Sequence, residues 1–388
     1  MHALEKETIS IGLIGAGFRL RGVVRELLAT TSRLRVAVVY DPDSVSIGST
    51  REEFGERVRI ATSEEELVSD PTIDWVFIGS FNSKHARQAE LALRAGKHVF
   101  CEKPLATHLE DCLKVRKAIR ESGCIFAFGL VLRYSPHYQK LQSLVSGGRI
   151  GRIVSFEFNE TLHFDHGGYI FGNWRRDREL AGTHLLEKCC HDLDLANWII
   201  GSRPMRVASF GGNDFFVPDN APIADRLGCN PETGSPAFST WSDPHRISPF
   251  SPGATIVDNQ VAILQYANGV RATFHTNCAT SIYERRFYLC GTKGTIRADV
   301  ISGRIEVRDF GYNMPTEIYE NTAGGHGGGD VVLARGLRDT ILNGVPPLAS
   351  VDDGISSCIA AFGIDRAMDG GQVFDLTQDW QIVDKEAT

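Results

Sequence analysis

The chain has 388 residues, of which 42% are hydrophobic and 23% charged, a composition typical of a soluble globular protein with about two domains. Its net charge of −7 excludes a general electrostatic attraction to nucleic acid or to anionic membranes. The first residues, MHALEKETIS, lack the apolar core of a signal peptide, and no apolar run is long enough to span a bilayer.

Nine cysteines are scattered along the chain, without the C-x-x-C spacing of a metal site. Their number is odd, and Cys189 and Cys190 are adjacent, which is a poor geometry for a mutual disulfide. We therefore expect reduced thiols and a cytoplasmic location.

The stretch from residue 9 to residue 41 has the layout of a dinucleotide site. An apolar run short enough for a buried strand leads into a glycine turn, a segment with helical spacing follows, and a second apolar run ends in Asp41. Gly15 permits the tight turn, and Gly17 lets the backbone approach a pyrophosphate at the helix N-terminus. Asp41 can accept hydrogen bonds from a ribose diol.

One glycine of the G-x-G-x-x-G fingerprint is missing, because Leu20 takes its place and the next glycine is Gly22. The alternative is a tight strand-to-helix turn that binds no ligand. Asp41 favours NAD over NADP, because a carboxylate repels a 2′-phosphate.

Strands and helices alternate up to about residue 130. We expect strands at 58–60, 74–79, 98–101 and 125–128, and helices at 64–68, 84–94 and 109–121. Helices of this length between strands predict a parallel sheet with right-handed crossovers. Residues 1–130 therefore form a doubly wound nucleotide-binding domain.

Residues 131–388 follow a different pattern. We expect helices at 136–145, 184–200, 330–342 and 354–368, and strands at 153–162, 205–210, 255–266, 270–276, 285–290, 295–300 and 304–310. Asn268-Gly269 and Ser302-Gly303 are hairpin signals, which predict a large, mostly antiparallel open sheet in an α+β domain. Helices can cover one face of this sheet. The other face is predicted to be buried between subunits of a homo-oligomer, a dimer or a tetramer.

Residues 211–254 form a long insertion that holds seven of the fifteen prolines. It either shapes a substrate pocket or makes an excursion over the surface.

The tripeptide Glu102-Lys103-Pro104 stands at the C-terminal end of the fifth predicted strand. Ligands lie along this edge of a doubly wound sheet, so Lys103 can point its ammonium toward one. The alternative is an ordinary exposed lysine at the start of a loop.

The helix predicted at 184–200 carries chemistry-bearing side chains. Glu187, His191, Asp194 and Trp198 fall at helical spacing on one face, which suits a general base held by carboxylates. A metal site and a solvated, salt-bridged face are the alternatives.

Together these motifs resemble the Gfo/Idh/MocA family of nicotinamide-dependent sugar and polyol oxidoreductases. The matching stretches are IGLIGAG with Asp41, IGSFNSKH at 78–85, Glu102-Lys103-Pro104, RYSPHYQKLQSLVSGGRIGRI at 133–153 and the segment 187–201. The family's usual helix pattern is Asp-x-Gly-x-His-x-x-Asp, whereas this chain has Glu187 and Cys189 at the first two motif positions.

The resemblance implies a Rossmann domain followed by a domain with a large open sheet, and bound NAD or NADP. We expect no metal, because no further ligand stands at metal spacing from the segment 187–194. The resemblance also implies a catalytic pair, Lys103 and His191, and Glu187 is the third expected catalytic residue. The expected cofactor-binding residues are Gly15, Gly17, Phe18, Arg19, Asp41, Ser80, Asn82, His85, Glu102 and Lys103. The expected substrate residues are Arg133, Tyr134, Trp174, Arg175, Asp194 and His326.

These features predict an NAD-dependent dehydrogenase of a sugar, a sugar derivative or a cyclic polyol. One rival is an NAD-dependent glycoside hydrolase that oxidises its sugar transiently, eliminates the aglycone and reduces the product again. The other is a non-catalytic sensor that binds NAD and a sugar.

Overall fold

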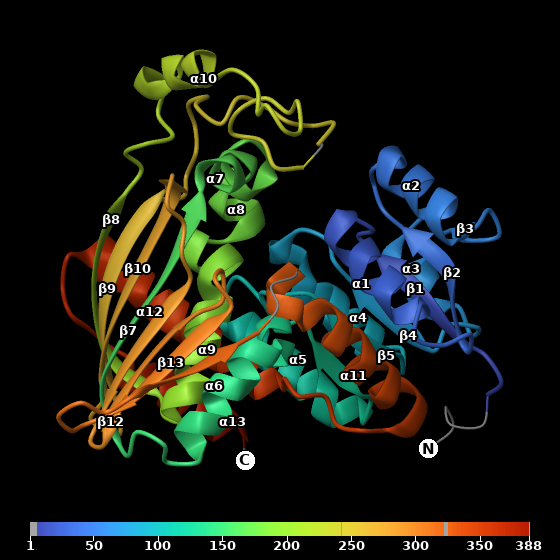
Figure 1. Cartoon of the computed structure of the whole chain (residues 1–388). Helices are drawn as coiled ribbons and strands as arrows, with labels where there is room; N and C mark the ends of the chain where they lie inside the picture. Colours follow the sequence, from blue (N-terminus) through green and yellow to red (C-terminus); the bar gives the residue numbers. More distant parts are fainter. Residues whose placement is uncertain (1–5, 242, 322–324, 388) are drawn as a thin grey trace. The chain divides into compact units, whose positions relative to one another are not determined.

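The computed structural model describes residues 6–241, 243–321 and 325–387, and the chain divides into two compact units. The first unit comprises Met1–Pro136 and Gly324–Cys358, and the second comprises His137–Ala323 and Ile359–Thr388. Figure 1 shows the course of the chain through both units. No helix among the described residues is long and apolar enough to cross a membrane.

The first unit is a six-stranded parallel sheet in the order β3-β2-β1-β4-β5-β6. Its strands are β1 (Ile9–Ile14), β2 (Leu34–Tyr40), β3 (Arg59–Ile60), β4 (Trp75–Ile78), β5 (His98–Cys101) and β6 (Phe126–Phe128). Its helices are α1 (Phe18–Leu28), α2 (Ser44–Phe54), α3 (Glu64–Ser69), α4 (His85–Arg94), α5 (Leu109–Ser122) and α11 (Gly329–Asn343), with 3-10 turns η2 (Asn82–Lys84), η3 (Val131–Tyr134) and η7 (Gly325–Gly328). The predicted Rossmann sheet is confirmed.

Helix α11 packs against α1, beside which it is drawn in Figure 1. Leu333 and Leu337 of α11 join the buried core that includes Val24 and Phe77. The sequence placed α11 in the second domain, because an apolar stripe shows that a helix packs but not which partner it packs on.

The second unit is built on a nine-stranded sheet in the order β14-β13-β12-β11-β7-β10-β9-β8-β15. Its strands are β7 (Ile153–His163), β8 (Pro204–Gly212), β9 (Asn259–Tyr266), β10 (Arg271–Thr280), β11 (Arg286–Gly291), β12 (Gly294–Asp299), β13 (Arg304–Asp309), β14 (Thr316–Glu320) and β15 (Phe374–Asp375). β7 and β10 pair in parallel, and the other neighbouring strands in this order pair antiparallel, so the prediction of a mostly antiparallel sheet is confirmed.

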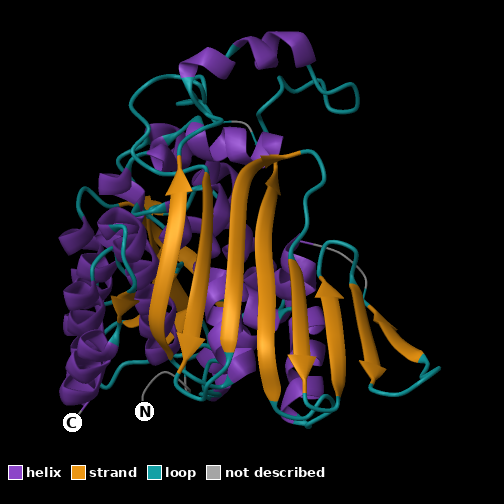
Figure 2. Ribbon diagram, turned by 90° about the vertical axis from the view of Figure 1, so that its left-hand side faces the viewer, coloured by secondary structure: helices purple, strands orange, loops and turns teal. Residues whose placement is uncertain are grey.

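One face of this sheet is packed and the other is exposed. Side chains of β9 alternate strictly, with Ala262 and Leu264 buried but Val261 and Ile263 47% and 61% exposed. In Figure 2, which looks onto the exposed face, no helix of the described residues crosses it. The helices assigned mainly to this unit are α6 (Pro136–Ser146), α7 (Phe164–Phe171), α8 (Arg178–Ala181), α9 (Cys190–Ile200), α10 (Pro222–Leu227), α12 (Val351–Gly370) and α13 (Thr377–Ala387), with short turns η4 (Trp174–Arg176), η5 (Leu185–Cys189) and η6 (Pro218–Asn220).

Candidate functional site

The turn between β1 and α1 leaves a helix N-terminus open. Gly15 has a φ of +76°, and a Cβ there would lie 2.4 Å from the backbone of Ser80, so only glycine fits. Gly17 is the N-cap of α1 and makes no side-chain cap bond, and a Cβ at Gly17 would meet no atom within 4 Å. The first N–H groups of α1 therefore border open space that a phosphate can occupy.

Asp41 lies beside this turn, at the end of β2. Its Oδ2 accepts a 2.7 Å hydrogen bond from the backbone N–H of Ala16, and its Oδ1 accepts one of 2.8 Å from that of Asp43. Burial raises the pKa of Asp41, and these two N–H groups act against the rise. The turn and the acid are thus hydrogen-bonded neighbours, as a ribose site next to a pyrophosphate site requires.

Two carboxylates hold Arg19 in the first turn of α1. Its Nε donates to Glu102 Oε1 at 3.0 Å, and its Nη1 donates to Asp330 Oδ1 at 2.6 Å. Asp330 Oδ2 also lies 2.8 Å from Nδ1 of His326. Burial alone would raise the pKa of Asp330, but His326 and Arg19 lower it overall. Arg19 therefore ties the segment after β5 and the first turn of α11 to α1, a role that the sequence did not indicate.

His85 supports the loop that carries Lys103. The ring of His85 is 1% exposed, with Nδ1 2.8 Å from the carbonyl oxygen of Pro104 and Nε2 3.2 Å from that of Ser80. Burial lowers the pKa of His85, and the two carbonyls oppose this. These contacts are with backbone, so His85 positions Lys103-Pro104 after β5.

The residues at the ends of β1, β2, β4 and β5 share one edge of the parallel sheet. The strand order reverses between β1 and β4, and ligands of doubly wound folds bind at such a switch point. The open helix N-terminus and the bonded acid fit a dinucleotide, with its pyrophosphate at α1 and a ribose at Asp41. Phe18, the first residue of α1, is 60% exposed, while Asn82 of η2 is 4% exposed.

The helix predicted at 184–200 consists of two elements. η5 is a π-helical turn, and α9 begins only at Cys190. Because a π turn takes more residues per turn than an α-helix, the regular spacing that placed Glu187 and His191 on one face does not hold across η5. Single π turns inside helices occur frequently at functional sites.

The acids and the imidazole of this segment are buried. Glu187 is 7% exposed, His191 4% and Asp194 1%, so the alternative of a solvated, salt-bridged face is wrong. No group of three or more His, Cys, Asp or Glu among the described residues is arranged to hold a metal ion.

Arg175 brings several predicted residues together. Its Nε donates to Glu187 Oε1 at 3.1 Å. Its guanidinium carbon lies 4.4 Å from the ring centroid of Trp174 and 4.9 Å from that of Tyr169. Such stacking fixes the plane of the guanidinium. Glu187 therefore orients Arg175 from the turn that precedes His191.

A buried charge cluster holds the other side of the same segment. Arg285 binds both carboxylate oxygens of Asp192, through Nε and Nη2, at 2.7 Å each. Glu160 on β7 forms ion pairs with both cations of this segment: its Oε2 lies 2.6 Å from Arg285 Nε and its Oε1 lies 3.4 Å from Lys188 Nζ. All three members of the Arg285–Asp192–Glu160 contact are less than 10% exposed. Their charged partners are far apart in the chain, so sequence spacing alone could not reveal this cluster.

Comparison with known proteins agrees with these observations. Residues 9–130 match the model of the oxidoreductase family with an NAD-binding Rossmann fold, GFO_IDH_MocA, and residues 138–297 match the Gfo/Idh/MocA C-terminal domain. The two models together span most of the chain in the expected order. The chain belongs to the Gfo/Idh/MocA family.

Among similar curated proteins is the 1,5-anhydro-D-fructose reductase of Ensifer adhaerens, 27% identical over 74% of this chain and 74% of its own. The inositol 2-dehydrogenase 2 of Saccharopolyspora erythraea is 33% identical over 50% of this chain and 54% of its own. A solved levoglucosan dehydrogenase in complex with NADH and levoglucosan shares the fold, with a TM-score of 0.76 at 18% identity, and covers 95% of this chain and 100% of its own.

Cys189 stands where the Gfo/Idh/MocA helix pattern usually has glycine, and its side chain is buried. Cys189 Sγ lies 3.5 Å from His184 Nε2 and 3.4 Å from Thr276 Oγ1. Burial raises the pKa of the Cys189 thiol and lowers the pKa of His184 to about 4. Cys189 is therefore a buried packing residue just before α9, in contact with His184 and Thr276.

The six expected substrate residues fall into both units. Trp174, Arg175 and Asp194 lie in the second, whereas Arg133, Tyr134 and His326 lie in the first. Tyr134 is 5% exposed within the first core, and its hydroxyl accepts a hydrogen bond from the Leu348 N–H at 3.0 Å.

Arg133 is also 5% exposed, and it pairs with Asp353 at 2.9 Å. This pair binds the η3 segment to the start of α12, a structural role that the RYSPHY motif did not reveal.

Proposed function

We propose that this protein is an NAD-dependent dehydrogenase of a sugar, a sugar derivative or a cyclic polyol. The observation that supports this most strongly is the open N-terminus of α1 beside Asp41, on the same sheet edge that carries Lys103. The names of the relatives, an anhydrofructose reductase and an inositol dehydrogenase, favour this substrate class.

The proposed reaction divides between two side chains. NAD supplies the hydride acceptor when it is bound. As the C–H bond of the reacting carbinol gives up its hydride, the O–H bond breaks and a carbonyl forms. His191 accepts the hydroxyl proton, since a neutral imidazole is a suitable base near pH 7. Lys103 donates to the same oxygen and stabilises the charge that develops on it.

Glu187 acts on the substrate through Arg175 in this proposal. Part of the donor capacity of Arg175 is used by Glu187, and the rest can bind a hydroxyl or a carboxylate of the substrate. An acidic sugar would gain most from this arrangement.

The second candidate is the redox-neutral glycoside hydrolase. Glu187 and Cys189, at positions where the family usually has Asp and Gly, are the observation that favours it. Such an enzyme releases an aglycone with no net NADH.

One panel separates these functions. Sugars, uronic acids, inositols and aryl glycosides are incubated with NAD or NADP, and absorbance at 340 nm is read beside product chromatography. We expect stoichiometric NADH from at least one sugar or polyol. Aglycone release without NADH would replace the dehydrogenase by the hydrolase, and a clear preference for NADP would contradict the role of Asp41.

A further inference from the structure

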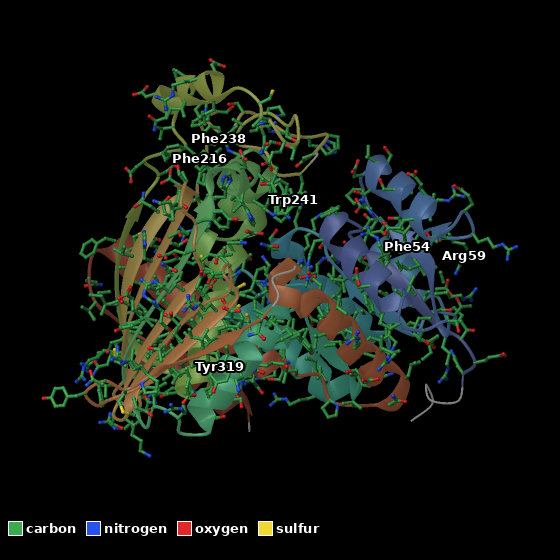
Figure 3. The ribbon with its side chains drawn as sticks, viewed as in Figure 1. Phe54, Arg59, Phe216, Phe238, Trp241 and Tyr319 are labelled. Carbon is green, nitrogen blue, oxygen red and sulfur yellow. The ribbon has the colours of Figure 1, made fainter. Side chains whose placement is uncertain are left out.

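The insertion at 211–254 is docked on α7 through an aromatic core. Phe216 stacks on Phe171 with ring centroids 4.5 Å apart, and Phe238 and Phe250 complete the cluster at 5.0 Å from each other. Figure 3 shows Phe216, Phe238 and Trp241 gathered at this end of the second unit. The insertion is therefore packed against the helix along part of its length, so it is more than an excursion over the surface.

Two features fix the register of this docking. Gly168 of α7 approaches the insertion so closely that a Cβ would lie 2.2 Å from the carbonyl oxygen of Phe238. The N–H of Phe238 donates to Asp165 Oδ1 at 2.6 Å, and Phe238 has a φ of +61°. Both contacts lie within a few residues of Trp241, so they limit where its ring can lie.

Trp241, Tyr169 and His166 form an aromatic wall. The ring centroid of Trp241 lies 4.8 Å from that of Tyr169 and 5.1 Å from that of His166, with interplanar angles of 81° and 79°. These edge-to-face contacts are the preferred geometry of aromatic pairs. Trp241 nevertheless remains 38% exposed, so a defined part of an oriented indole is open to a ligand.

The aromatic wall is connected to the proposed site by direct contacts. Tyr169 is stacked by the guanidinium of Arg175, and Arg175 donates to Glu187 on the turn before His191. Tyr169 and Arg175 thus stand between Trp241 and the catalytic segment. The aromatic wall is thus linked to Glu187 through Tyr169 and Arg175.

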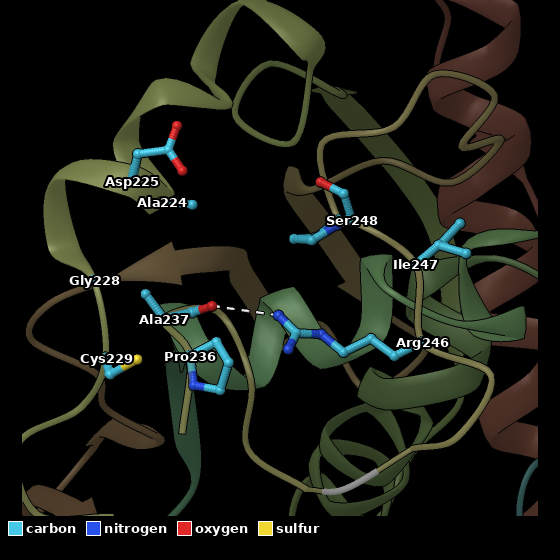
Figure 4. Close-up of a pocket in the computed structure, with 10 residues that line it drawn as sticks. Ala224, Asp225, Gly228, Cys229, Pro236, Ala237, Arg246, Ile247 and Ser248 are labelled. Atoms are coloured by element: carbon cyan, nitrogen blue, oxygen red, sulfur yellow. Dashed lines mark hydrogen bonds between the residues drawn. The ribbon is translucent and has the colours of Figure 1, made fainter. Parts of the chain in front are cut away.

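The insertion also lines an open hollow of about 560 Å³, shown in Figure 4. Its lining comes from residues 224–249 and includes Asp225, Cys229 and Arg246, but not Trp241. Arg246 donates to the carbonyl oxygen of Ala237 across it at 3.4 Å. Its lining includes none of Trp241, Tyr169 and His166, so this hollow is distinct from the aromatic wall.

We propose that Trp241 binds a second ring of the substrate, so that this enzyme prefers a glycoside or a disaccharide over the corresponding monosaccharide. The inference rests on the proposed sugar oxidoreductase function and specifies its substrate. The C–H groups on one side of a pyranose carry partial positive charge and match the negative face of an indole. A ring already oriented by its neighbours loses little conformational entropy on binding.

The test compares matched pairs of probes on the NAD-loaded enzyme: glucose and cellobiose, glucuronic acid and 4-nitrophenyl β-D-glucuronide, and myo-inositol and galactinol. For a pair that the enzyme uses, we expect a higher kcat/KM for the larger member. Trp241→Ala should lower that value by about threefold to tenfold, mainly through KM, and should change the smaller member less than about twofold. Trp241→Phe should keep most of the preference.

Tyr312→Ala is the matched control, because Tyr312 is a fully exposed aromatic residue outside the insertion. Calorimetric binding of each probe with NADH present separates this inference from the proposed function. NADH formation from small probes alone, with no tighter binding of any larger probe, would overturn the role of Trp241 and leave the oxidoreductase standing. An equal effect of Trp241→Ala on both members of a pair would overturn it as well. Tighter, Trp241-dependent binding of a larger probe without turnover would support the second-ring contact and count against the dehydrogenase.

Discussion

Arg285 shows what individual residues contribute around α9. Burial raises the pKa of Asp192 to about 6, and Arg285 opposes that rise. Two carboxylates balance the positive charge of the buried Arg285 guanidinium: Asp192, which binds it in a bidentate pair, and Glu160. Removing one member of such a pair lowers the free energy of unfolding by far more than the intact pair contributes to it, because the remaining charge stays buried without its partner.

We therefore expect Arg285→Met to lower the free energy of unfolding by about 3–5 kcal/mol near pH 8. The loss should be smaller near pH 5. Folding raises the pKa of the Asp192 carboxyl. Such a group destabilises the folded state increasingly as the pH rises from the pKa of the unfolded state to the pKa of the folded state. Without Arg285 the pKa of Asp192 in the folded state is higher still, so this destabilisation is larger at pH 8.

Urea unfolding at the two pH values measures this effect. Arg286→Met is the control, because Arg286 is next in sequence but pairs with the exposed Glu157, a contact worth less than about 1 kcal/mol. A loss of similar size in both variants, or no dependence on pH, would contradict the role given to Arg285.

At the scale of elements, the sequence predicts well those structures that are formed by residues close together in the chain. The β1 strand, the glycine turn, α1 and Asp41 have short spacings with a physical reason for each residue, and the structure has them in place. The hairpin signals were also correct: Gly269 and Gly303 have φ of +85° and +71° at the turns between β9 and β10 and between β12 and β13.

Elements without a periodic signal were missed. Helix α2 buries only Thr50, so it has no apolar stripe, and Asp43, which caps it by accepting from Val45 and Ser46, was the available sign. The π turn η5 was missed because its residues read as ordinary helix. The partners of Arg19 and Arg285 could not be predicted, because folding alone brings those distant carboxylates to them.

The exposed face of the second sheet supports the predicted homo-oligomer. Phe210 of β8, 73% exposed, pairs with Val261 of β9, and Ile263 is exposed on the same face. An apolar strip of this kind on a sheet usually marks an interface.

We expect an oligomer by gel filtration with light scattering, and we expect Ile263→Glu to shift it toward monomer, since a buried carboxylate at an interface is strongly unfavourable. Val45→Glu, a substitution of a half-exposed residue in α2, should have no effect. A wild-type protein that is monomeric at micromolar concentration would contradict the interface.

At the scale of the whole molecule, the proposed chemistry draws on both units. Lys103 belongs to the first unit, with the cofactor residues, and His191 belongs to the second, with Glu187 and Arg175. The proposal therefore makes turnover depend on both Lys103 and His191.

The most direct measurement is the rate of NADH formation by Lys103→Met and by His191→Ala, on whichever sugar or polyol the wild type oxidises. Each variant should lose at least about a hundredfold in kcat. NAD affinity by calorimetry should stay within about threefold of wild type, because the glycine turn and Asp41 are unchanged. Lys114→Met, on the exposed side of α5, serves as the control and should keep full activity. A near wild-type rate in either the Lys103 or the His191 variant would contradict the account.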